Sequence, residues 1–262
     1  MYDLFLKWAA VRQDDTVLDV GVTSDQSYTS SNYLEAWYPH KDRITAAGID
    51  DASFLEQLYP GLRFVRADGL NLPFADRSFD VVHSSAVLEH VGSLESQARF
   101  IAQCARVARR ALFLTTPNNW FPVEFHTVLP LVHWLPKPAF RALMRRSGRA
   151  FFAEEANLNL MTRRELCAAV ASIAGSPDAE RFDFRVESVR LWGWPSNLLV
   201  IGTERPSKKC SSAGGGQSAS RPDHPAHGAG RHDDDRPRHA GVLGILAIPG
   251  KRSHPALDPP DA

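Results

Sequence analysis

Acidic and hydroxyl side chains stand at the ends of short apolar runs in the first third of the chain. Asp19, Asp50 and Asp68 each end such a run, and Ser84 and Ser85 end a fourth. Carboxylates accept hydrogen bonds from hydroxyl and amino groups, and hydroxyls both donate and accept them. A solvated loop or helix cap explains any one acid alone. Polar side chains at four successive strand ends, all at one edge of a sheet, favour a binding site for a small polar ligand.

The apolar runs alternate with longer amphipathic segments, which predicts an α/β fold with a doubly wound, mostly parallel, Rossmann-like sheet. The predicted strands are TVLDVG, RITAAGID, LRFVRAD, FDVVHSS and ALFLTTP. A helix is predicted from Ser93 to about Arg109, and another begins at Thr162, where TRRE forms a capping box. The runs FDFRVESVRL and SNLLVIGTE flank GWPS and predict a final antiparallel hairpin that ends near Glu204.

Composition indicates one main globular domain. Of the 262 residues, 44% are hydrophobic, and 30 basic residues balance 30 acidic ones, so the net charge gives no sign of nucleic-acid binding. Cys104, Cys167 and Cys210 are widely spaced, and neither a disulfide framework nor a metal site is predicted. Because there is no signal peptide pattern and no apolar run of about 18 residues, we expect a cytoplasmic protein.

The composition changes after Glu204. Aromatic residues all precede that point, whereas the remainder is rich in His, Pro and Gly. Such a segment buries too little apolar surface to offset the entropy lost on ordering. We therefore predict one domain over residues 1–204 and a disordered, low-complexity tail over residues 205–262. A functional tail and a reading-frame accident both stay open, and the spacing of the tail histidines fits no metal geometry.

The run RADGLNLPFADRSFDVVHSSAVLEHV, from Arg66 to Val91, is the most specific motif in the chain. It resembles the class I S-adenosylmethionine-dependent methyltransferases, especially the branch similar to quinone-biosynthesis (type 11) methyltransferases. An acidic residue, a Leu-Pro-Phe turn, a Phe-Asp strand start and a Leu-Glu-His end follow in that family's order. The resemblance extends over about residues 10–204. It implies the class I fold, S-adenosyl-L-methionine as cofactor and methyl transfer to a small molecule.

The resemblance also implies cofactor contacts at the strand ends. Asp50 would accept hydrogen bonds from both ribose hydroxyls of the cofactor. Asp68 would accept one from the adenine amino group, and the backbone amides of Gly69 and Leu70 would reach the ring edge. Ser84 and Ser85 would contact the methionine portion. None of these contacts requires a metal ion.

The loop after the first predicted strand, VLDVGVTSDQSY, departs from the family pattern Asp-x-Gly-x-Gly-x-Gly. Asp19 and Gly21 are kept, Thr23 and Asp25 stand at the later glycine positions, and Ser24 offers a hydroxyl. Such glycines let a backbone wrap closely around a pyrophosphate. Because S-adenosylmethionine has no phosphate, we expect this loop to bind it with altered geometry, through Asp19, Gly21 and Ser24.

A segment after the fifth predicted strand, NNWFPVEFHTVLPLVHWLPKPAFRALMRR, predicts a helical cap insertion over about residues 118–160. Its aromatic residues would either line a pocket for a lipophilic or aromatic acceptor or pack within the cap itself: Trp120, Phe121, Phe125, Trp134 and Phe140. Its basic end, KPAFRALMRR, would either contact a membrane surface peripherally or pack on the protein.

Methyl transfer needs alignment and water exclusion, and a general base helps where the acceptor is a hydroxyl or an acidic carbon. Candidate bases near the strand ends are His83, Glu89, His90, Glu124 and His126. His83 is assigned a structural role because it lies within a predicted strand. His126, on the cap, and His90 are the candidate catalytic residues, with fixing of the local loop as the alternative for His90 and Glu89.

Two other functions are compatible with part of the pattern. One is a nicotinamide-dependent oxidoreductase on a similar sheet, against which the missing Gly-x-Gly-x-x-Gly motif argues. The other is a non-catalytic module whose altered loop no longer binds cofactor. The sequence leaves the acceptor, the methylated atom and the oligomeric state open.

Overall fold

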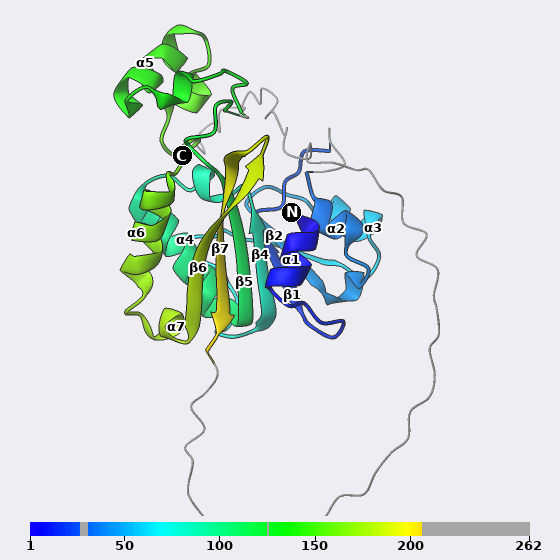
Figure 1. The fold of residues 1–262 in the computed structure, drawn as a ribbon. Helices are drawn as coiled ribbons and strands as arrows, with labels where there is room; N and C mark the ends of the chain where they lie inside the picture. The colour runs from blue at the N-terminus through cyan, green and yellow to red at the C-terminus, as the bar shows by residue number, and fades with distance from the viewer. Residues whose placement is uncertain (27–30, 125, 206–262) are drawn as a thin grey trace, which may run out of the picture. The chain divides into compact units, whose positions relative to one another are not determined.

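A computed structural model describes residues 1–26, 31–124 and 126–205. The predicted tail lies outside the described residues from position 206 onward, as does Phe125 of the cap. The described strands form one seven-stranded sheet in the order β3-β2-β1-β4-β5-β7-β6 (Figure 1). Their bounds are β1 Val17–Val20, β2 Ile44–Gly48, β3 Arg63–Arg66, β4 Phe79–Ser85, β5 Ala108–Pro117, β6 Phe182–Leu191 and β7 Trp194–Glu204.

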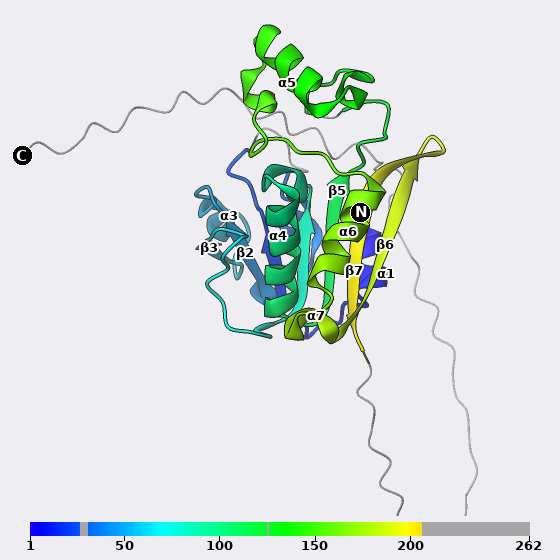
Figure 2. The same ribbon diagram turned by 90° about the vertical axis from the view of Figure 1, so that its left-hand side faces the viewer.

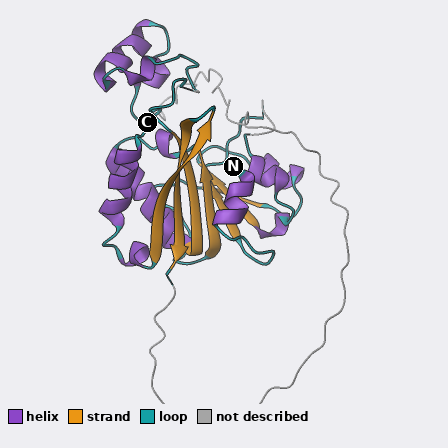
Figure 3. Ribbon diagram, viewed as in Figure 1, coloured by secondary structure: helices purple, strands orange, loops and turns teal. Residues whose placement is uncertain are grey.

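Helices connect the strands and cover both faces of the sheet (Figure 3). The α-helices are α1 Tyr2–Trp8, α2 Tyr33–Trp37, α3 Phe54–Leu58, α4 Leu94–Val107, α5 Lys137–Arg146, α6 Arg163–Ile173 and α7 Pro177–Glu180. The short 3-10 helices are η1 Lys41–Arg43, η2 Leu88–His90, η3 Val132–Trp134 and η4 Ala150–Ala153. In the described ranges no helix is long and apolar enough to span a bilayer.

The first five strands pair in parallel, and β7 pairs antiparallel with both β5 and β6. This confirms the predicted doubly wound sheet with a terminal antiparallel hairpin. The hairpin turn differs from the prediction at GWPS, because β7 already begins at Trp194. Trp192 and Gly193 have φ values of 51° and 84°. Two successive positive φ values make the two-residue turn that suits the twist of a hairpin.

Two hydrophobic clusters pack the two faces of the sheet. Phe100 and Ile101 of α4 and Leu166 of α6 belong to one cluster. Phe5 of α1 and Leu34 of α2 belong to the other. Helices α4 and α6 therefore cover one face, and α1 and α2 cover the opposite face (Figures 1 and 2).

The predicted helix starts are confirmed at two caps. The Ser93 hydroxyl accepts from the Ser96 amide at the start of α4. The capping box at α6 is complete, with Thr162 and Glu165 each accepting from the other's backbone amide. Helix α4 ends at Val107, two residues before its predicted end near Arg109, because Ala108 already pairs with Phe79 in the sheet.

The cap follows β5 and lies beyond the carboxyl ends of the parallel strands, with α5 farthest out (Figures 1 and 2). It has a small hydrophobic cluster of its own, formed by Phe140, Met144, Ala153, Leu158 and Leu160. Phe140 therefore packs within the cap, which is one of the two roles considered for the aromatic residues of this segment.

Candidate active site

Glycines let the loop after β1 lie against neighbouring backbone. The amides of Gly21 and Val22 both donate to the Ala47 carbonyl, at 2.7 and 3.2 Å. Gly21 has a φ of +100°, and a Cβ added there would lie 2.2 Å from a methyl carbon of Val87. A Cβ at Gly48 would lie 2.5 Å from the Val22 carbonyl oxygen. A side chain at either glycine would therefore displace the loop from the strand ends.

The Asp19 carboxylate points into the core of the α1–α2 face. Its Oδ1 accepts from His83 Nδ1 at 2.7 Å, and His83 Nε2 lies 2.7 Å from the Tyr33 hydroxyl. Asp19 and His83 are both buried and are opposite residues of the β1–β4 register. Because its carboxylate is already paired there, a cofactor contact through the Asp19 side chain stays a prediction.

The next two acids lie at the same edge of the sheet, because β2 and β3 are parallel neighbours and Asp50 and Asp68 each follow one of them. Both residues are exposed. Asp68 Oδ1 accepts from the Leu70 amide at 2.8 Å, so this amide is occupied within its own turn. A Cβ at Gly69 would lie 2.4 Å from the Phe100 ring, so the turn after Asp68 packs directly on α4.

The hydroxyl residues after β1 and at the end of β4 are more enclosed than Asp50 and Asp68. Ser84 is buried, and its Oγ donates to the Val20 carbonyl at 2.7 Å, which ties β4 to β1. Ser85 Oγ lies 3.1 Å from Thr115 Oγ1. Ser24 is half-buried in the loop just before the stretch 27–30, which lies outside the described residues. The roles of these hydroxyls toward a cofactor stay predictions.

These positions suit the polar groups of an adenosyl cofactor. Two exposed carboxylates at adjacent strand ends can accept from hydroxyl and amino hydrogens. Gly21 lets the chain turn at the end of β1 with a φ of +100°. Contacts to the cofactor would therefore come from Asp50, Asp68 and the loop backbone. Asp19 and Ser84 instead hold strands β1 and β4 together next to the site.

The two candidate catalytic histidines meet across the boundary between sheet and cap. His90 Nε2 of η2 lies 3.1 Å from His126 Nε2 of the cap. His90 Nδ1 lies 2.6 Å from the Asn157 carbonyl oxygen, and His126 Nδ1 lies 2.6 Å from Glu124 Oε1. The sequence suggested each histidine separately. Their contact and the role of Asn157 were missed, since no periodic pattern links η2 to the cap.

Buried carboxylates flank this histidine pair. The Glu124 oxygens accept from the backbone amides of His126 and Thr127. Burial alone would raise the pKa of Glu124, but the hydrogen bond and charge of His126 lower it to about 2. Burial lowers the pKa of His126, but the hydrogen bond and charge of Glu124 raise it above its ordinary value. Glu89, also buried, accepts from the Thr116 hydroxyl at 2.9 Å.

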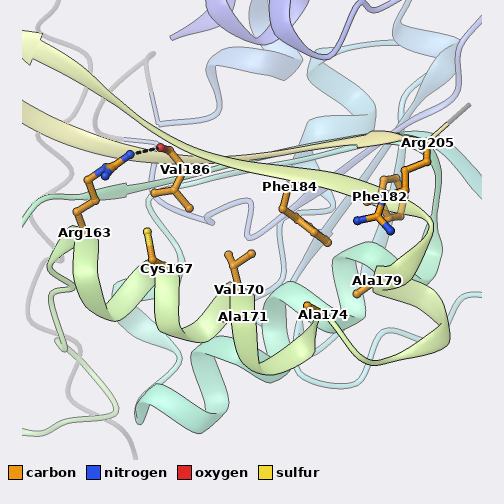
Figure 4. Close-up of a pocket in the computed structure, with 10 residues that line it drawn as sticks. All are labelled: Arg163, Cys167, Val170, Ala171, Ala174, Ala179, Phe182, Phe184, Val186 and Arg205. Atoms are coloured by element: carbon orange, nitrogen blue, oxygen red, sulfur yellow. Dashed lines mark hydrogen bonds between the residues drawn. The ribbon is translucent and has the colours of Figure 1, made fainter.

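A pocket along the outer edge of the sheet lies between α6 and β6 (Figure 4). Cys167 and Val170 line it from the helix, and Phe184 and Val186 line it from the strand. Arg163 spans the gap by donating to the Val186 carbonyl at 2.8 Å. None of the residues predicted to bind cofactor lines this pocket, so it is separate from the strand-end site.

The sheet order and the antiparallel β7 confirm the predicted fold, which is that of class I S-adenosylmethionine-dependent methyltransferases. Residues 30–113 match the family model described as a methyltransferase domain. Among solved structures, the YcgJ protein from Bacillus subtilis is similar with a TM-score of 0.50 and 14% identity. That likeness covers 78% of this chain and 98% of the other, and it concerns the fold alone.

Two relatives from Mycobacterium tuberculosis share shorter regions. The probable S-adenosylmethionine-dependent methyltransferase Rv3030 is 44% identical over 81 residues, covering 29% of this chain and 28% of the relative. A phthiotriol/phenolphthiotriol dimycocerosates methyltransferase is 33% identical over 129 residues, covering 49% of this chain and 43% of the relative. The chain thus spans less than half the length of these relatives. The matches confirm the predicted resemblance to the S-adenosylmethionine-dependent methyltransferases, whose cofactor is S-adenosylmethionine, and they favour this class over the oxidoreductase.

Proposed function

We propose that this chain transfers the methyl group of S-adenosylmethionine to a small, lipophilic acceptor held between the strand ends and the cap. One arrangement supports this most directly. The Asp50 and Asp68 carboxylates and the His90–His126 pair stand at the same carboxyl edge of the parallel strands. In such sheets, ligands bind outside that edge.

The cofactor half of the site consists of Asp50, Asp68 and the loop at Gly21. Asp50 binds the ribose hydroxyls, and Asp68 binds the adenine amino group. When bound, S-adenosylmethionine supplies a methyl group already activated by its sulfonium, so the protein needs mainly to align the reactants and exclude water. Ser84 and Ser85 keep β4 in place beside the methionine portion.

The acceptor half consists of the histidine pair and the cap. Glu124 fixes the His126 ring by its Nδ1, which directs Nε2 toward His90 and the strand ends. The pair contacts the ionisable group of the acceptor and assists the loss of its proton. A lipophilic acceptor is supported by the relative that is a lipid methyltransferase and by exposed aromatic surface at Trp120, whose ring lies 5.9 Å from that of Trp134.

The cellular setting belongs to the same proposal. It includes a cytoplasmic location, which the sequence pattern predicts. Peripheral contact with a membrane surface would use α5, where exposed Leu143 stands beside Arg145 and Arg146 of the last turn. A nucleic-acid partner is not expected from the neutral net charge.

The test separates cofactor binding from acceptor chemistry. Asp50→Ala removes a charge-assisted acceptor and should weaken S-adenosylhomocysteine affinity about tenfold or more by calorimetry. Asp42→Ala is the matched control, because Asp42 is an exposed acid at the opposite end of β2. His126→Ala should keep that affinity but lower methyl transfer from labelled cofactor to quinones, phenols and lipid extracts.

Several outcomes would count against the proposal. Equal affinity in the Asp50→Ala and Asp42→Ala variants would remove the ribose assignment. Binding of NAD in place of S-adenosylhomocysteine would favour the oxidoreductase. Tight S-adenosylhomocysteine binding without transfer to any acceptor class in the panel would favour a non-catalytic module.

A further inference from the structure

Three metal-ligating side chains converge where η2 meets the cap. Glu89 and His90 come from η2, His126 comes from the cap, and one ligand atom of each lies within 4.8 Å of the others. The Glu89 side chain is fully buried, the His126 side chain is 9% exposed, and the His90 side chain is 33% exposed. The cluster is therefore enclosed, with one accessible side at His90.

Hydrogen bonds at the Nδ1 atoms determine what the two rings present to each other. The Asn157 carbonyl can only accept, so His90 Nδ1 is the donor in their 2.6 Å contact. The Glu124 carboxylate likewise accepts from His126 Nδ1. In their neutral forms, both rings then carry a lone pair on Nε2, and the two Nε2 atoms face each other at 3.1 Å. A proton or a metal cation between them resolves this repulsion.

The surroundings of Glu89 favour a metal cation over a shared proton between the two rings. Its Oε2 accepts from Thr116, but its buried Oε1 has no hydrogen-bond partner among the described residues. This Oε1 lies 3.9 Å from His90 Nε2. With Glu124, the cluster holds two buried carboxylates beside two imidazoles. A single shared proton would leave Glu89 Oε1 unpartnered, whereas a divalent cation would give this oxygen a partner.

The spacing of the two histidine nitrogens also matches known metal coordination, whereas Glu89 Oε1, 3.9 Å from His90 Nε2, would have to move closer to complete the site. Two histidine nitrogens at about 2.0–2.1 Å from a tetrahedral zinc ion lie about 3.3 Å apart, close to the observed 3.1 Å. A histidine ligand usually donates its other nitrogen to a carboxylate or a backbone carbonyl. Glu124 and Asn157 do this for His126 and His90.

We propose that Glu89, His90 and His126 bind one divalent transition-metal ion, with zinc as the reference case. Two imidazoles and one carboxylate leave coordination positions for water or for an oxygen of a bound molecule. If the proposed methyl transfer is correct, the acceptor oxygen takes such a position and loses its proton more readily, to solvent water at the accessible side of the cluster. Only this last role rests on the proposed function. Binding of the cation does not.

The test measures metal binding on the full chain after treatment with a chelator. Zinc affinity is obtained by competition with a chromophoric chelator, and cobalt substitution reports the ligand geometry through its visible absorption. We expect one tight equivalent in the unaltered chain. His126→Ala should lose it, and Glu89→Gln, which preserves side-chain shape, should weaken it. Glu124→Gln should lower affinity about 10–100-fold by releasing the His126 ring.

Two controls separate this site from other histidines and from misfolding. His40→Ala removes a histidine before β2 and should retain the tight equivalent, as all variants retain any weak binding by the tail histidines. Unchanged S-adenosylhomocysteine affinity verifies the fold of each variant.

Equal zinc binding by the unaltered chain and by folded His126→Ala would overturn the metal site. So would a cobalt spectrum that Glu89→Gln leaves unchanged. Either result would leave the methyltransferase proposal intact, because cofactor affinity is measured separately. A proton shared between the two rings would then account for their 3.1 Å contact.

Discussion

At the scale of single residues, buried polar groups support the sheet next to the site. Asp19, His83 and Tyr33 form a hydrogen-bonded series between β1, β4 and α2. Glu35 of α2 is fully buried near the same series. Burial first, and the Asp19 carboxylate second, raise the pKa of Glu35 well above its ordinary value. Burial of Glu35 in the helix that follows the cofactor loop therefore favours its protonated form.

This gives a pH prediction with a definite sign. Between the ordinary pKa of a glutamate and the raised pKa of Glu35, the folded protein keeps a proton that the unfolded chain releases. The stabilisation is complete below the ordinary pKa and is lost as pH rises toward the raised one. Glu35→Gln has no such proton to release. Its free energy of unfolding should therefore fall less between pH 5 and pH 7.5 than that of the unaltered chain, by about 1 kcal/mol or more.

The measurement is urea unfolding at both pH values, with Glu187→Gln as control. Glu187 lies on β6 and is exposed, so its loss should leave the pH dependence of stability unchanged. If the free energy of unfolding changes by the same amount between pH 5 and pH 7.5 in Glu35→Gln and in the unaltered chain, the raised pKa of Glu35 would be excluded.

At the scale of elements, local caps and turns set where helices and strands begin. The α6 capping box fixes the chain where it returns from the cap to the sheet. Thr162→Ala should lower the free energy of unfolding by about 1 kcal/mol, the usual effect of losing an N-cap hydroxyl. Thr162→Ser keeps the hydroxyl and should recover most of that stability. Equal losses in both variants, measured by urea unfolding, would attribute the effect to the Thr162 methyl group instead.

Element positions could be predicted largely from local sequence, and side-chain directions could not. The parallel strands follow from apolar runs, and α6 follows from its capping box. Asp19 lies in a strand buried on both faces, where alternation of polar and apolar residues is absent, so its direction into the core had no sequence signal. The contact between His90 and His126 depends on how the cap folds back onto η2, which no local pattern encodes.

At the scale of the whole molecule, the sheet and the cap make the proposed site together. The strand ends provide the groups for the cofactor, and the cap provides His126 and Glu124. The Lys137 Nζ donates to Asn159 Oδ1 at 2.9 Å, and the Asn159 side chain donates to the Gly92 carbonyl at 2.7 Å. These bonds connect α5 to the segment after η2, so the position of the cap is coupled to the histidine pair.

The boundary of the domain is testable by truncation. The composition predicted a boundary after Glu204, but Arg205 still contacts the sheet. Its amide donates to the Arg181 carbonyl at 2.8 Å, and its side chain pairs with Asp183 at 2.6 Å. A chain ending at Arg205 should therefore keep the Tm and the S-adenosylhomocysteine affinity of the full chain.

A chain ending at Glu204 is the matched comparison for this truncation. It loses one backbone hydrogen bond and one exposed ion pair, which together contribute about 1 kcal/mol to the free energy of unfolding. Its Tm should lie a few degrees below that of the chain ending at Arg205. If the chain ending at Arg205 instead loses much of its stability or its cofactor affinity, residues 206–262 contribute to the folded domain and the predicted division at the composition change is wrong.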